Sequence, residues 1–85
     1  MTAPYERRGL NFEGKPVLIS VDAPPKIARP FLARCHGATM AAMDRGASED
    51  EYVQSILEAA ADMHLVASLR KRDDREIVFE VRSPR

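Results

Sequence analysis

Hydrophobic and polar residues alternate in the N-terminal part of the chain. Every second residue from Leu10 to Phe12, and again from Val17 to Val21, is hydrophobic. A period of two is typical of a β-strand that buries one face, and Glu13-Gly14 between the two runs is a turn sequence. The pattern predicts a β-hairpin, in which the second strand has the stronger signal and the first has coil as its alternative.

The same alternation returns after His64. From Leu65 to Leu69, and again from Ile77 to Val81, every second residue is hydrophobic or small. The segment Lys71–Asp74 between these two runs is polar. We therefore expect a second hairpin with one apolar face.

A first helix is predicted after the first hairpin. The strand ends at Asp22-Ala23-Pro24-Pro25, because proline lacks the amide hydrogen that a strand ladder needs. Proline suits the first turn of a helix and is costly in its interior. Pro30 therefore predicts a short separate turn over Pro25–Arg29, followed by a helix over Phe31–Met43.

A second helix is predicted from its capping residues. Ser48 followed by Glu51 is a capping box, in which each side chain binds a backbone amide left free at the helix start. Gly46 is placed to end the preceding helix in a left-handed conformation. The second helix is expected from Glu49 to about Met63, and hydrophobic residues at helical spacing form its buried stripe: Val53, Ile56, Leu57, Ala60 and Met63.

The element order ββααββ predicts an α+β fold. We expect a small antiparallel sheet of three to four strands with two helices packed on one face. The 85 residues are too few for two ordinary domains, so residues 1–85 form one domain. Residues 1–7 and 83–85 lack a periodic pattern and are expected to be flexible.

The composition indicates where the protein is located and whether it associates. The chain is 45% hydrophobic and 31% charged, with 13 basic and 13 acidic residues, which is typical of a folded protein. It has no apolar run of about 20 residues and no signal-peptide pattern, so we expect a cytoplasmic protein that does not enter a membrane. Cys35 is the only cysteine; without a disulfide or a zinc-site spacing, association is the remaining route to more burial, and a homodimer is predicted.

The residues that carry chemistry favour structural roles. Cys35 and His36 are neighbours on a helix and point about 100° apart, so they do not form a nucleophile and base pair. His64 is interpreted as a residue at a helix C-terminus. The acids Glu51 and Glu58 belong to a solvated helix face. Since no phosphate-binding loop or metal motif occurs, we expect no catalytic residue, cofactor or metal, and no enzymatic activity.

Two surface features are candidates for binding a partner. Three aliphatic residues fall on the outward side of the predicted strands: Leu18, Val66 and Val78. They either form a patch that a partner covers or are scattered residues that favour strands. Four basic residues gather at the second hairpin turn: Arg70, Lys71, Arg72 and Arg75.

The function predicted from these features is a non-enzymatic protein-interaction module. Such a module acts as a regulator, an inhibitor or an accessory subunit of bacterial or phage type, and it binds a protein partner or a second copy of itself. The aliphatic residues and the basic turn are its expected contacts. The alternative is a nucleic-acid-binding protein whose basic turn Arg70–Arg75 contacts phosphates.

Overall fold

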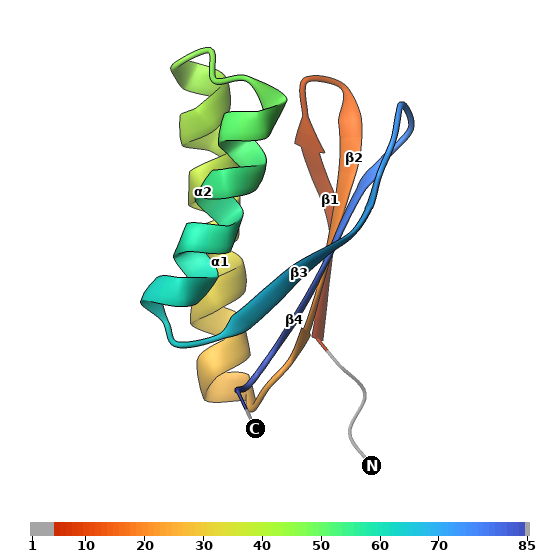
Figure 1. Ribbon diagram of the computed structural model, residues 1–85. Coiled ribbons are helices and arrows are strands. Elements are labelled where there is room, and N and C mark those ends of the chain that lie inside the picture. The colour runs from red at the N-terminus through yellow and green to blue at the C-terminus, as the bar shows by residue number, and fades with distance from the viewer. Residues whose placement is uncertain (1–4, 85) are drawn as a thin grey trace.

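The computed structural model describes residues 5–84, which form two hairpins separated by two helices (Figure 1). The elements are β1 (Tyr5–Phe12), β2 (Lys15–Asp22), α1 (Pro25–Asp44), α2 (Glu49–Asp62), β3 (Val66–Arg72) and β4 (Ile77–Arg82). The predicted order ββααββ and the α+β class are confirmed.

The four strands of the described residues form one mixed sheet in the order β1-β2-β4-β3. The hairpins β1-β2 and β3-β4 are antiparallel, whereas the central strands β2 and β4 pair in parallel. The sheet expected from the sequence was antiparallel throughout, and the central pair corrects that expectation.

The chain path and the charge of β3 explain the parallel pair. The helices α1 and α2 run antiparallel to each other, so they return the chain to the end of the sheet where β2 stops (Figure 1). β3 then runs opposite to β2, and β4 runs in the same direction as β2. Because β3 ends in Arg70-Lys71-Arg72, it suits an edge, and the more apolar β4 takes the place beside β2.

One face of the sheet is covered by both helices, as predicted (Figure 1). α1 lies over β1 and β2, and α2 packs against β3. The alternation seen in the sequence is reproduced in the burial of the two central strands, whose inward residues are all buried: Val17, Ile19, Val21, Ile77, Phe79 and Val81. The helices contribute further buried side chains, among them Phe31, Tyr52 and Ile56.

The first strand forms, although the sequence left coil as its alternative. It begins at Tyr5, which pairs with Val21, so the predicted flexible start reaches less far than residue 7, and residues 1–4 lie outside the described part. Glu13 (φ 53°) and Gly14 (φ 84°) both have positive φ, which matches the two-residue turn preferred in hairpins. Asn11 supports this turn, since its Oδ1 accepts a hydrogen bond from the Gly14 amide at 2.8 Å.

The first helix is continuous from Pro25 to Asp44, and Pro30 lies inside it. The predicted break before Phe31 is wrong. Proline removes the hydrogen bond to the carbonyl of Lys26 four residues earlier, but both residues are exposed, so water can reach that carbonyl. Ala28 and Phe31 on either side of Pro30 have 0% exposure, and their packing holds the helix together through the proline.

The ends of the helices follow the predicted capping residues. The Ser48 hydroxyl accepts from the Glu51 amide at 3.1 Å, and the Glu51 carboxylate accepts from the Ser48 amide at 2.8 Å. Gly46 has a φ of 67° and ends α1 in the left-handed conformation. His64 takes the same conformation after α2, with a φ of 59°, and its amide donates to the carbonyl of Ala61 at 3.0 Å. The histidine thus ends a helix, as predicted.

Candidate functional site

The three outward aliphatic residues lie on the uncovered face of the sheet but do not form one patch. Leu18 and Val78 are register partners on the central strands, and both are half-buried. Val66 lies opposite Arg82 at the other end of β4. The polar pair formed by Ser68 and Glu80 lies between Val66 and the two central residues. The structure therefore brings together two of the three.

Two of the four predicted basic residues are paired with acids of their own hairpin. Arg70 donates to the Glu80 carboxylate at 2.8 Å on the uncovered face. The Lys71 ammonium lies 2.7 Å from the carboxylate of Glu76 and 3.7 Å from that of Asp73. Its hydrogen bond to Glu76 raises the pKa of Lys71 above the ordinary value. Both charges are thus partly satisfied within the chain.

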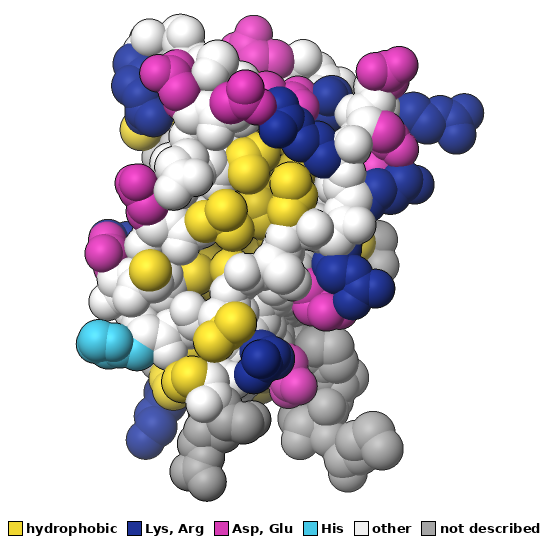
Figure 2. Space-filling model, in the orientation of Figure 1, with side chains coloured by type: hydrophobic (Ala, Val, Ile, Leu, Met, Phe, Trp, Pro, Cys, Tyr) yellow, Lys and Arg dark blue, Asp and Glu magenta, His cyan; other side chains and the backbone are white. Residues whose placement is uncertain are grey.

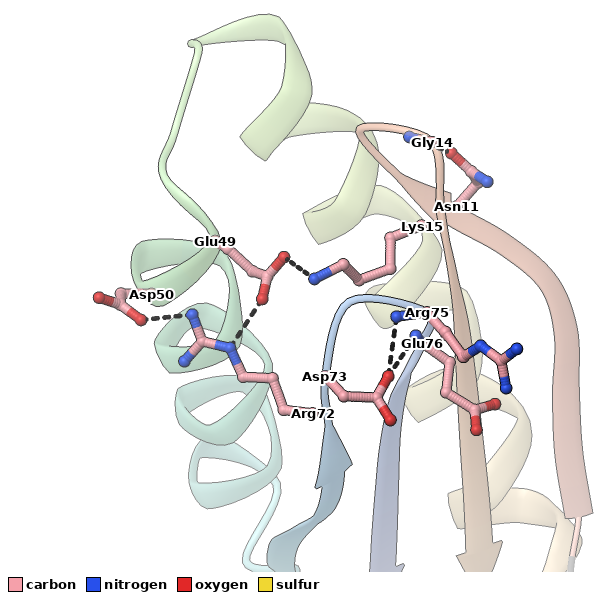
Figure 3. Close-up of polar contacts among 9 residues, drawn as sticks. All are labelled: Asn11, Gly14, Lys15, Glu49, Asp50, Arg72, Asp73, Arg75 and Glu76. Atoms are coloured by element: carbon pink, nitrogen blue, oxygen red, sulfur yellow. Dashed lines mark hydrogen bonds and ion pairs between the residues drawn. The ribbon is translucent and has the colours of Figure 1, made fainter.

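Arg72 points to the opposite side of the sheet, toward the start of α2 (Figure 3). It forms an ion pair with Glu49 at 2.7 Å and with Asp50 at 2.6 Å. Glu49 also binds Lys15 of the first hairpin at 2.7 Å. The hydrogen bond from Lys15, and after it the one from Arg72, lowers the pKa of Glu49. One carboxylate therefore joins both hairpins to α2, a contact that no sequence motif indicates.

Arg75 lies in the turn itself, where its backbone amide binds the Asp73 carboxylate. The amides of Arg75 and Glu76 donate to Oδ1 of Asp73 at 2.8 and 3.0 Å (Figure 3). These two backbone hydrogen bonds lower the pKa of Asp73. The four basic residues thus divide between the two faces of the sheet and the turn, and they do not converge on one position.

An exposed apolar side chain also lies on the helix-covered side of β3. Leu69 pairs with Phe79, and directly opposed residues of antiparallel strands share a face. Phe79 has 0% exposure, whereas Leu69 is 36% exposed. The sequence pattern placed Leu69 correctly on the inward face but did not indicate its exposure. The charged run Arg70–Arg72, which marks β3 as an edge strand, was the available signal.

The neighbouring side of α2 continues this surface. Asp50 contacts Arg72 of β3, and this contact identifies the side of α2 that faces the strand. Val53 and Leu57 follow at one and two helical turns along that side. Figure 2 shows hydrophobic side chains gathered between α2 and β3, with Lys and Arg along the β3 side. We call this surface the apolar strip, and it consists of Val53, which is 7% exposed, the half-buried Leu57 and Ala67, and the exposed Leu69.

The apolar strip borders a free sheet edge. Among residues 5–84, β3 pairs with β4 alone, so the backbone groups on its other side face away from the sheet. Its register with β4 is regular from Val66 to Leu69 and is interrupted between Leu69 and Lys71 by a bulge. A regular segment of free strand edge therefore runs directly beside the strip.

The buried polar side chains of the core serve packing. The hydroxyls of Thr39 and Tyr52 are 2.8 Å apart, and the Thr39 hydroxyl also donates to the carbonyl of Cys35. Burial raises the pKa of the Cys35 thiol to about 12, so the thiolate needed for nucleophilic attack is scarce at neutral pH. His36 beside it is exposed, which agrees with the predicted divergence of the two side chains.

The described residues provide neither a metal site nor a helix that could span a membrane. Between residues 5 and 84, no three His, Cys, Asp or Glu side chains are grouped so that they can hold a metal ion. In the same residues, neither helix has the length and apolar character required to cross a membrane. Comparisons of the chain with protein-family models, curated proteins and solved structures found no match.

Proposed function

We propose that this chain is a small non-enzymatic protein-interaction module, acting as a regulator, inhibitor or accessory subunit, and that its partner docks on the apolar strip and the free edge of β3. The observation that carries the proposal is the exposure of Leu69. A leucine that shares a face with the fully buried Phe79 remains 36% exposed, at the point where the sheet edge is also open.

Two properties of the surface support a protein as the partner. Apolar side chains of α2 and β3 gather beside one another (Figure 2), whereas single exposed apolar residues are normal on a protein surface. The rim is polar at one end, where Asp50 and Arg72 form an ion pair. An apolar centre with a polar rim is typical of protein interfaces.

The chemistry of the core supports a role without catalysis. Cys35 was the first candidate nucleophile, but its side chain has 0% exposure and its thiol has a pKa raised to about 12. The hydroxyl of Tyr52 is engaged by Thr39, and burial raises the Tyr52 pKa as well. Cys35 and Tyr52 are both fully buried, so we assign them to the packing of the core.

The test uses a photo-crosslinking amino acid at position 69 or at position 40. Leu69 and Met40 are both exposed, at 36% and 48%, but Leu69 belongs to the apolar strip, whereas Met40 lies on α1, outside the proposed docking surface. The full chain is produced in cells of its source organism, irradiated and purified, and covalent adducts are identified by mass spectrometry. Position 40 is the control for an exposed apolar side chain outside the proposed docking surface.

We expect a discrete adduct with a different protein from position 69 and a much weaker one, or none, from position 40. The same adduct should disappear when unlabelled chain in excess competes for the partner. Equal adducts at both positions, or none at position 69, would contradict the proposal. A discrete nucleic-acid adduct in place of a protein would favour the alternative function.

A further inference from the structure

We infer that the exposed side of α1 binds a second copy of this chain, so that the two α1 helices lie antiparallel against each other. The contact residues recur at intervals of three or four along the helix, and we call them the α1 surface: Arg29, Ala33, Gly37, Met40 and Asp44. All five are exposed. The inference goes beyond the proposed function, because the α1 surface is separate from the apolar strip and both can be occupied together.

The α1 surface faces away from both the sheet and α2. The buried residues of the helix are Ala28, Phe31, Cys35, Thr39 and Ala42. At 3.6 residues per turn, the α1 surface lies on the opposite side of the helix from these residues. Arg34 marks the flank of α1 that faces α2, since its guanidinium pairs with Asp62 at 2.7 Å. The α1 surface is therefore covered by no other element of residues 5–84.

The centre of the α1 surface is uncharged. Met40 has the largest exposure among the large hydrophobic side chains of the described residues, at 48%. Ala33 and Gly37 lie beside it, so no charge occurs on this surface between Arg29 and Asp44. The exposed face of a helix that contacts only water usually carries charged residues along its whole length. An uncharged centre with charged ends is typical of a helix face that packs against another helix.

The fold of a single copy does not require glycine at position 37. A Cβ at this position would meet nothing within 4 Å, and the backbone does not have a positive φ. Glycine inside a helix is less stable than alanine, because it loses more backbone freedom on folding. A second helix that approaches closely at Gly37 explains why no side chain is present there.

The charges at the two ends of the α1 surface favour a second copy as the occupant. Arg29 lies near the start of the helix and Asp44 is its last residue. Neither forms an ion pair within the described part of the chain. In an antiparallel pair, Arg29 of each copy faces Asp44 of the other. A twofold axis repeats this contact, so the same surface is complementary to itself in charge.

One register satisfies the charged and the apolar contacts together. Arg29 and Asp44 are equally distant in sequence from the midpoint between residues 36 and 37, and so are Ala33 and Met40. A twofold axis at this midpoint places Met40 of each copy opposite Ala33 of the other, so a long side chain fills the space beside a short one. Gly37 then lies at the crossing point, where the two backbones are closest.

The first experiment reverses the charges and then restores them. Sedimentation of the full-length chain over a range of concentrations at low salt measures the equilibrium between monomer and dimer. Arg29→Asp and Asp44→Arg each place like charges opposite one another, and each should weaken the dimer at least about tenfold. The double variant exchanges the two charges and should recover most of this loss. Glu58→Arg on α2 controls for the change in net charge.

The charge reversals should leave the single chain folded. An acid near the start of a helix and a base at its end both suit the helix dipole, so the thermal unfolding midpoint of each variant, measured in dilute solution, should not fall. A double variant that does not regain affinity would overturn the inference. A wild-type chain that stays monomeric at every concentration would overturn it as well.

The second experiment tests the close approach at Gly37. Glutamine favours a helix more than glycine does, so Gly37→Gln should not lower the unfolding midpoint of the dilute chain. Its side chain separates the two helices, however, and should weaken the dimer at least about tenfold. Ala61→Gln, at an exposed position of α2, should leave the dimer unchanged. An unchanged dimer in Gly37→Gln would contradict the proposed contact.

This inference and the proposed function fail separately. A photo-crosslinking amino acid at position 40 should give an adduct of the chain with itself, of twice the mass of one copy, whereas position 69 should give an adduct with a different protein. Loss of either adduct leaves the other proposal standing. A dimer that dissociates in Leu69→Gln but persists in Gly37→Gln would place the second copy on the apolar strip and overturn the inference.

Discussion

The two edge strands of the sheet differ in how their inward side chains are covered. In β1, Leu10 and Phe12 are 5% and 2% exposed, whereas Leu69 of β3 is 36% exposed. Phe12 stacks on the Tyr52 ring of α2, with the ring centroids 4.3 Å apart and the planes within 2°. Position at a sheet edge is therefore not what exposes Leu69.

The difference indicates a division of labour between the two edges. Leu10 and Phe12 of β1 are sealed into the core, and their main contribution is to the free energy of folding. The corresponding side of β3 remains partly open although α2 lies next to it. A buried edge stabilises the domain, and an open apolar edge is available to a partner.

The largest effect is expected where the sealed edge is broken. Phe12→Ala removes the stacked ring and leaves a cavity against Tyr52, so the free energy of unfolding should fall by about 3–5 kcal/mol. Urea unfolding followed by circular dichroism measures this change. A loss below about 1 kcal/mol would mean that β1 is not sealed as described.

The next effect concerns the carboxylate that joins the two hairpins. Glu49→Gln weakens the ion pairs to Lys15 and Arg72, and because these groups are partly exposed to solvent we expect a loss of only about 1 kcal/mol at pH 7. The pKa of Glu49 is lowered in the folded state from 4.5, so its contribution is complete above that pH and disappears as the pH falls through the lower folded value.

Unfolding of the wild type and of Glu49→Gln should therefore be compared between pH 7 and pH 3. The difference in unfolding free energy should shrink below pH 4.5 and should also shrink in high salt. Glu58→Gln in the same helix controls for the loss of one negative charge. A difference that does not depend on pH would show that the carboxylate is not the source of the effect.

Local signals in the sequence predicted most of the elements. Local patterns can be recognised in the sequence because they depend on neighbouring residues. The capping box at Ser48 and Glu51 and the alternation from Val17 to Val21 are of this kind. Pro30 was misjudged because its cost is local, whereas the packing of Ala28 and Phe31 that offsets it is tertiary. Strand order was likewise decided by competition between β3 and β4 for the central place.

The candidate site was less predictable than the fold. The pattern assigned Val66 and Leu69 to opposite faces correctly, and for the outer face it left open a patch that a partner covers or scattered residues that favour strands. The exposure of Leu69 depends on where α2 ends its coverage of β3, and no local pattern contains that information. The ion pairs of the basic cluster were also not predictable from local sequence, since the partners of Arg72 are more than twenty residues away.

The two helix ends allow a smaller comparison of the same kind. Gly46 and His64 both adopt a left-handed conformation, which glycine takes easily and a residue with a Cβ does not. His64→Gly should therefore raise the unfolding free energy by about 0.5–1 kcal/mol. Gly46→Ala should lower it by a similar amount, because a Cβ there meets nothing within 4 Å and only the backbone strain remains. Thermal unfolding of both variants checks the opposite signs.

The smallest effect on stability is expected at the open edge, and it tests the division of labour most directly. Leu69→Gln keeps the β and γ carbons and places its amide where water already reaches, so the unfolding free energy should change by no more than about 0.5 kcal/mol. The same change at Leu10, which is 5% exposed, buries an amide without a partner and should cost several times more. Urea unfolding of the two glutamine variants, measured side by side, makes the comparison. An equal loss of unfolding free energy in Leu69→Gln and Leu10→Gln would mean that Leu69 mainly stabilises the core. Its exposure would then not indicate a binding surface.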